Sequence, residues 1–180
     1  MDPFQEFSLK RAEYERAKHK LLIGIFGSFR RDEIFLLHQA LLDDDFRVCI
    51  TTDLESEVPK GPGMSKDAYN YLLSITLLTR CEIRIFLFHR EHEGEHNVNQ
   101  SASMELQYLA QEGLNESVFI LLEEGYVQQS GGVFKGLKAN FDTACRWESY
   151  RDFPALIDMV RKFLFNRILF LSGDPNRRRM

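Results

Sequence analysis

Four short, nearly continuous apolar runs, separated by segments of helical periodicity, constrain the fold of this chain more than any other feature. The runs cover residues 21–26, 46–51, 82–89 and 117–122. Runs of this length, rich in β-branched and aromatic residues, are typical of strands buried on both faces of a parallel sheet. Between them, apolar residues recur at helical spacing, at Ile34, Leu37 and Leu41 and again at Leu72, Ile75 and Leu78. This alternation predicts right-handed βαβ units with helices on both faces of the sheet.

The two ends of the chain add helices to this core. Residues 5–20 are rich in Glu, Lys, Arg and Ala and indicate a surface helix. Its apolar stripe is thin, so it must pack on another element. A short strand is expected at 144–147 and a long helix at 153–171. We therefore expect a single α/β domain: a three-layer sandwich with a parallel, flavodoxin-like sheet of four to five strands (21–172), an N-terminal helix (1–20) and a flexible tail (173–180).

Composition and charge exclude several classes of protein. The net charge of −4 argues against general nucleic-acid binding, which needs a basic surface. No apolar run approaches the roughly 20 residues that span a bilayer, and the charged N-terminus does not resemble a signal peptide. The three cysteines form no CxxC pair, so neither a disulfide framework nor a zinc site is indicated. We expect a cytoplasmic protein without a cofactor or a membrane partner.

The turn after the first apolar run is the first candidate for ligand binding. In a parallel sheet, ligands bind outside the carboxyl ends of the strands, where Gly27, Ser28, Phe29 and Arg30 follow the first run. A glycine lets backbone amides approach a ligand, and the next helix N-terminus favours an anion. The segment matches neither GxxxxGK[ST] nor GxGxxG, so it gives no support to NTP hydrolysis or ordinary dinucleotide binding. A tight turn with a solvated helix start is the alternative interpretation.

The segment from Asn99 to Leu106 carries the strongest catalytic candidate, Glu105. With Ser101 as a favourable N-cap, Glu105 falls in the first or second turn of a helix, at the edge of its apolar face. A half-sheltered carboxylate beside a loop is suited to act as a nucleophile or general base. The alternative is an exposed acid that complements the helix dipole.

Two further groups of side chains lie near the same strand ends. The loop 89–96 contains three histidines and three glutamates, residue types that suit a divalent metal. Its spacing matches no helix-borne metal motif, so we expect a solvated loop without metal, in which His89 could donate a proton. Asp53 ends the second run, where it could bind a ribose hydroxyl or serve a turn.

Two motifs carry a family resemblance. The Phe26-Gly27-Ser28-Phe29 turn and the helix start Ser103-Met104-Glu105-Leu106-Gln107-Tyr108 resemble the nucleoside 2-deoxyribosyltransferase-like group. The same layout is similar to TIR-type domains, some of which cleave the glycosidic bond of NAD. The resemblance covers roughly residues 21–122.

The resemblance implies an enzyme acting on the N-glycosidic bond of a nucleoside, nucleotide or NAD, with Glu105 as its nucleophilic or transition-state-stabilising carboxylate. Asn99, Asp53, Ser101 and Ser103 complete the implied site. The transferases usually carry Asp where this chain has Asn99, which argues against efficient transfer and less against a glycohydrolase or a site that only binds. The competing hypothesis is a non-catalytic TIR-like or nucleotide-sensing module. Apolar surface on the N-terminal helix and at Phe163, Phe165 and Phe170 predicts a homodimer.

Overall fold

A five-stranded, all-parallel sheet forms the centre of the molecule. The computed structural model describes residues 3–114, 116–126, 136 and 145–173. The strand order is β2-β1-β3-β4-β5, and every neighbouring pair is parallel. The strands are β1 (Ile23–Phe26), β2 (Val48–Cys49), β3 (Ile83–Phe88), β4 (Val118–Glu123) and β5 (Arg146–Tyr150). The expected α/β fold with a parallel sheet is thus confirmed, with five strands.

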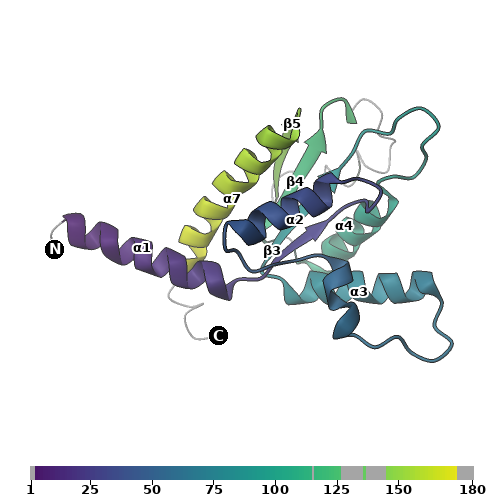
Figure 1. Cartoon of the computed structure of the whole chain (residues 1–180), viewed down its shortest axis with the longest axis horizontal. Coiled ribbons are helices and arrows are strands. Elements are labelled where there is room, and N and C mark those ends of the chain that lie inside the picture. The colour runs from purple at the N-terminus through teal and green to yellow at the C-terminus, as the bar shows by residue number, and fades with distance from the viewer. Residues whose placement is uncertain (1–2, 115, 127–135, 137–144, 174–180) are drawn as a thin grey trace.

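Helices cover both faces of the sheet (Figure 1). They are α1 (Pro3–Lys20), α2 (Glu33–Asp43), the 3-10 helix η1 (Thr51–Ser56), α3 (Lys66–Arg80), α4 (Gln100–Glu112) and α7 (Phe153–Gly173). The core side chains of α2 and α7 pack on one face, and those of α3 and α4 pack on the other. The N-terminal helix precedes the first strand, as expected.

The sequence of β3 explains how one strand serves two cores. All six of its residues are buried. Successive side chains of a strand point to opposite faces, and helices cover both faces of this sheet. Ile83, Ile85 and Leu87 pack with α2 and α7. Phe86 and Phe88 pack with α3 and α4. A nearly continuous apolar run is therefore what a central parallel strand requires.

Several boundaries differ from those expected. The second strand is only two residues long, and η1 takes up Thr51 because the Asp53 carboxylate accepts a hydrogen bond from the Ile50 N–H at 2.8 Å. The fourth helix begins at Gln100, so Ser101 lies inside it rather than at its N-cap. At α3 it is Ser65 that caps, accepting from the Ala68 N–H at 3.2 Å. Local side-chain hydrogen bonds thus set the element ends.

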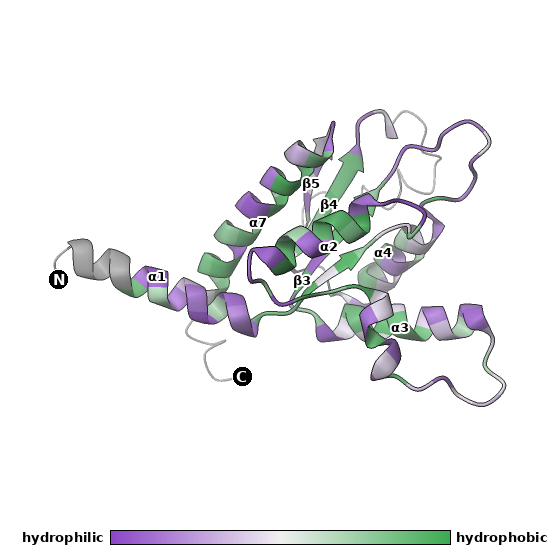
Figure 2. Ribbon diagram, in the orientation of Figure 1, coloured by the Kyte–Doolittle hydropathy of each residue, from purple (hydrophilic) through white to green (hydrophobic). Residues whose placement is uncertain are grey.

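The N-terminal helix packs on the last one and extends past the sheet (Figure 1). The Tyr14 and Phe165 rings meet at 5.2 Å. In Figure 2 the described part of α1 is mostly hydrophilic, while β4, in the sheet, is mostly hydrophobic. Phe163 is buried and stacks on Phe119, so it cannot contribute to a dimer surface as expected; Phe165 and Phe170 are exposed. Of the tail predicted at 173–180, residues 174–180 lie outside the described residues.

Candidate functional site

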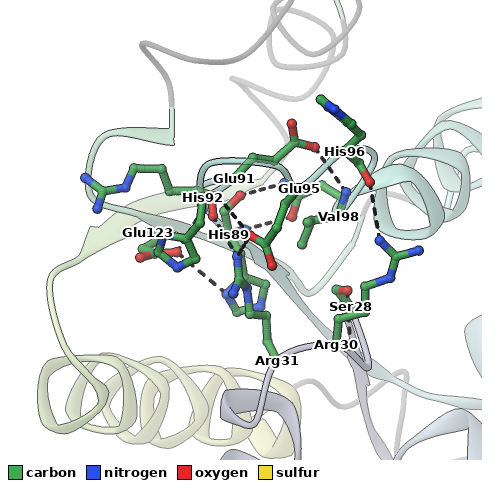
Figure 3. Close-up of polar contacts among 12 residues, drawn as sticks. Ser28, Arg30, Arg31, His89, Glu91, His92, Glu95, His96, Val98 and Glu123 are labelled. Carbon is green, nitrogen blue, oxygen red and sulfur yellow. Dashed lines mark hydrogen bonds and ion pairs between the residues drawn. The ribbon is translucent and has the colours of Figure 1, made fainter.

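The loops after β1 and β3 meet at the carboxyl edge of the sheet. The chain leaves β1 towards β2 on one side and leaves β3 towards β4 on the other. Such a point, where neighbouring strands lead in opposite directions, is where open α/β sheets bind ligands. Figure 3 shows the side chains of Arg30 and Arg31 directed at the loop that follows β3. The structure therefore brings together two of the segments predicted to form the site.

The turn after β1 is packed tightly against β3. A Cβ atom on Gly27 would meet the Leu87 Cβ and carbonyl oxygen, each at 3.2 Å. Ser28 is buried, and its Oγ accepts a hydrogen bond from the Arg30 N–H at 3.3 Å. The Phe29 ring is exposed and contacts Phe35. Close approach of two strands, rather than approach of a ligand, is thus the visible reason for the glycine.

Two arginines fasten this turn to the loop 90–98. Arg30 Nη1 donates to the His96 carbonyl at 3.3 Å. Arg31 Nη2 donates to the Arg90 carbonyl at 3.0 Å and forms an ion pair with Glu95 at 2.5 Å. These contacts hold the loop against the sheet edge.

The loop also carries hydrogen bonds of its own. Glu95 accepts from the His92 N–H at 2.8 Å, and Glu91 accepts from the Val98 N–H at 3.1 Å. The His92 N–H and the Arg31 guanidinium hold the pKa of Glu95 below its usual range. Within the described residues, no group of three metal-ligating side chains forms. Glu91 and Glu95 thus bind backbone N–H groups, and Glu95 also binds Arg31. The spacing of the residues in the sequence did not predict these partners.

Asn99 clamps the backbone at the end of β3. Its Oδ1 accepts from the His89 N–H at 2.7 Å, and its Nδ2 donates to the His89 carbonyl at 2.6 Å. Asn99 is itself buried. Both halves of the amide are therefore engaged, and the residue predicted as catalytic has a visible structural role.

The His89 ring is fully buried and belongs to a polar cluster. Its Nδ1 lies 3.1 Å from the Tyr150 hydroxyl and 3.9 Å from Glu123 Oε2. Burial lowers the pKa of His89 and raises that of Tyr150, so both side chains are neutral at pH 7. Nε2 has no hydrogen-bond partner in the described part of the chain. Nothing in the sequence indicated that Tyr150, 61 residues from His89, would be its hydrogen-bond partner.

Glu105 is buried on the other face of the sheet, among the core residues of α4. The Ser74 hydroxyl of α3 donates to its carboxylate, and Oε2 has no partner among the described residues. Burial raises the pKa of Glu105 to about 7. Its hydrogen bond is thus to Ser74 and not to Ser28 or Asp53. The one signal for Ser74 is its place as a polar residue beside Leu73 and Leu77.

The remaining predicted residues are Asp53, Ser101 and Ser103, and none of them is hydrogen-bonded to Glu105. Asp53 accepts from the Ile50 N–H and lies 3.2 Å from His38 Nε2, on α2. Ser101 is exposed, and the Ser103 N–H donates to the Asn99 carbonyl in the first turn of α4. The structure shows no hydrogen bond from these residues to Glu105.

No family model matches the chain, and no curated protein matches it. The side chains themselves and the motifs around Gly27 and Glu105 are therefore the basis for assigning a function. Within the described residues, no helix has the length and apolar character needed to cross a bilayer.

Proposed function

We propose that this protein cleaves the N-glycosidic bond of a nucleoside, nucleotide or NAD, and that Glu105 is its catalytic carboxylate. One observation carries the proposal. Glu105 is a buried acid in the second turn of α4, the helix that starts where β3 ends, and its pKa is raised to about 7. A buried acid with an unpaired oxygen lowers stability, and such costs are found where function requires them.

The chemistry of the bond fits this acid. When the base leaves, the anomeric carbon develops positive charge, which a carboxylate stabilises or captures. Water then completes a hydrolysis, or a second base completes a transfer. A pKa of about 7 lets the group hold or release a proton near neutral pH. In an apolar surround the negative charge of Glu105 also acts more strongly than it would in water.

The Asn99 clamp favours hydrolysis over transfer. An Asp at this position could exchange a proton with an incoming base, whereas an amide cannot. Both amide groups of Asn99 are also bound to the His89 backbone. Glycohydrolysis needs no proton from this position, so we propose it as the main reaction.

A screen of substrates tests this proposal. Purified protein is incubated with nucleosides, nucleoside monophosphates and NAD, and the free base is measured by chromatography. The matched variants are Glu105→Gln and Glu112→Gln, because Glu112 is an exposed acid at the end of the same helix. We expect base release from the wild type and Glu112→Gln only. Equal release from all three proteins, or none from any substrate, would contradict the proposal.

An exposed ring cluster beside the site supports a second candidate, an interaction module without catalysis. Phe29 and Phe35 contact each other at 5.6 Å between ring centroids, and both are exposed, as is Leu36. Exposed apolar clusters of this kind mark contact surfaces. If association through α2 is the function, Phe35→Ser should abolish self-association in sedimentation experiments while Phe170→Ser, on α7, should not. A purely monomeric wild type would remove this candidate.

A further inference from the structure

Two buried polar nitrogens at the carboxyl edge have no hydrogen-bond partner among the described residues. They are His89 Nε2 and Arg31 Nε. The Arg31 charge acts on the His89 ring, and Figure 3 shows both side chains among the residues at this edge. A buried donor without an acceptor costs roughly 1–3 kcal/mol. Two in one place are therefore a feature that needs a ligand or a solvent molecule to explain it.

One of the two nitrogens of the His89 ring is paired. The Tyr150 hydroxyl stays protonated, because burial raises the pKa of this phenol. It lies 3.1 Å from His89 Nδ1, and the tautomer of the imidazole decides which of the two groups donates. Glu123, at 3.9 Å, is too far from Nδ1 for a hydrogen bond. In either tautomer, His89 Nε2 is a buried polar atom that requires a hydrogen-bond partner.

The charges around these nitrogens select a neutral partner. The carboxylates of Glu33, Glu95 and Glu123 act on the His89 ring from α2, the loop 90–98 and β4. The charge of Arg31 is already balanced by its ion pair with Glu95. A phosphate would add a negative charge among these acids. A hydroxyl oxygen instead accepts from an N–H and can donate its own proton to a carboxylate.

We infer that His89 and Arg31 bind the 2′- and 3′-hydroxyls of a ribose, so that the substrate is a ribonucleoside or ribonucleotide rather than a deoxyribonucleoside. The choice of ligand rests on the proposed function. A hydroxyl can accept from Arg31 Nε and can either donate to or accept from His89 Nε2, so two neighbouring sugar hydroxyls supply a partner for each nitrogen. The partner of His89, Tyr150, is in the core of the α2 and α7 face, whereas Glu105 is on α4, which covers the other face. A sugar in contact with both residues therefore crosses the end of β3.

The inference predicts a measurable preference for ribose. Calorimetry on the Glu105→Gln protein, which does not consume the ligand, compares adenosine, guanosine, cytidine and uridine with their 2′-deoxy forms. We expect at least one ribonucleoside to bind about tenfold or more tightly than its deoxy form, since one hydrogen bond to a buried donor is worth about that factor. Equal affinities, tighter binding of the deoxy form, or no binding at millimolar concentration would overturn the inference.

Variants of His89 show whether this residue causes the preference. In the same Glu105→Gln background, His89→Gln keeps an N–H near the position of Nε2, and His89→Leu removes it. We expect His89→Gln to retain the preference and His89→Leu to lose it, with melting temperatures confirming that both fold. A preference that survives in His89→Leu would overturn the assignment to His89. Ribose preference without turnover in the wild type would remove only the catalytic proposal, and turnover without ribose preference would remove only this inference.

Discussion

The two faces of the sheet bury ionisable groups in different ways near the same edge. On the face of α3 and α4, Glu105 stands among apolar side chains with one hydroxyl partner, Ser74. On the face of α2 and α7, His89 belongs to a cluster with Tyr150, Glu123 and Arg31. Burial favours the neutral form of both groups. An imidazole in water is already mostly neutral at pH 7, whereas a carboxyl group in water is almost fully ionised at that pH.

The two buried groups differ in how much they lower the stability of the folded state. Neutral His89 keeps one hydrogen bond, to Tyr150, and leaves Nε2 without a partner among the described residues. Glu105 also leaves one oxygen without a partner there, and its carboxyl group opposes folding further once it ionises in an apolar core. The first arrangement is typical of a structural or binding role. The second is typical of a site whose chemistry needs the charge.

The largest expected effect on stability is at Glu105. Below pH 4.5, the ordinary value, folded and unfolded chains are both protonated there, and the residue has no effect. As the pH rises, the unfolded chain releases its proton first, so the folded state loses stability until the pH exceeds about 7, the folded value. Because each pKa unit corresponds to about 1.4 kcal/mol, the free energy of unfolding falls by up to about 3 kcal/mol.

Glu105→Gln should therefore be more stable than the wild type at pH 8 by up to about 3 kcal/mol, and nearly equal to it at pH 4. Urea titrations at a series of pH values measure this difference. The exposed Glu112→Gln variant should show no such pH-dependent gain. A Glu105→Gln protein that is less stable than the wild type at pH 8 would mean that the buried charge is paired, against the contrast between the two faces.

The next effect concerns the histidine cluster. Tyr150→Phe removes the hydrogen-bond partner of His89 Nδ1 and should lower the free energy of unfolding by about 1–3 kcal/mol, since it leaves a buried polar atom unpaired. His89→Phe removes the other partner, and the double variant His89→Phe/Tyr150→Phe, which removes both, should lose less than the sum of the two single losses. Chemical denaturation of the wild type, both single variants and the double variant measures this coupling. Strictly additive losses would show that the two side chains do not interact.

The smallest effect is expected at Ser74. Its hydroxyl lowers the pKa of Glu105, so Ser74→Ala should move that pKa above 7. The pH at which the loss of stability levels off, and the pH at which any base release rises, should both shift upwards, by a few tenths to about one pH unit for the loss of one hydrogen bond. Ser74→Thr keeps a hydroxyl and should resemble the wild type. An unchanged pH profile in Ser74→Ala would show that Ser74 does not act on Glu105.

The sequence predicts the fold well because burial on both faces leaves a clear pattern. A strand such as β3 is apolar at nearly every position; its one charged residue, Arg84, is buried and donates to the Leu78 and Glu116 carbonyls. The short β2 and the start of α4 were less predictable. After β2, Asp53 accepts a hydrogen bond from the Ile50 N–H, and before α4 the Asn99 side chain binds the His89 backbone rather than capping the helix. Periodicity sets neither partner.

The candidate site was predictable only in part. The helix wheel places Glu105 at the edge of the apolar face, whereas in the structure it lies within that face. The partners of Glu105 and His89 are Ser74 and Tyr150, which come from distant segments. Such pairs arise from tertiary packing, and no local pattern in one sequence encodes them.

The most direct test of the central claim measures base release by wild type and Glu105→Gln from pH 5 to 9. Loss of the carboxylate should cost roughly 3–4 kcal/mol of transition-state stabilisation, or about 10² to 10³ in rate. In the wild type the rate should rise with pH and level off above about 7, the pKa of Glu105, while the variant stays low throughout. Equal rates for the two proteins at every pH would contradict the account and leave Glu105 as a buried acid without a catalytic role.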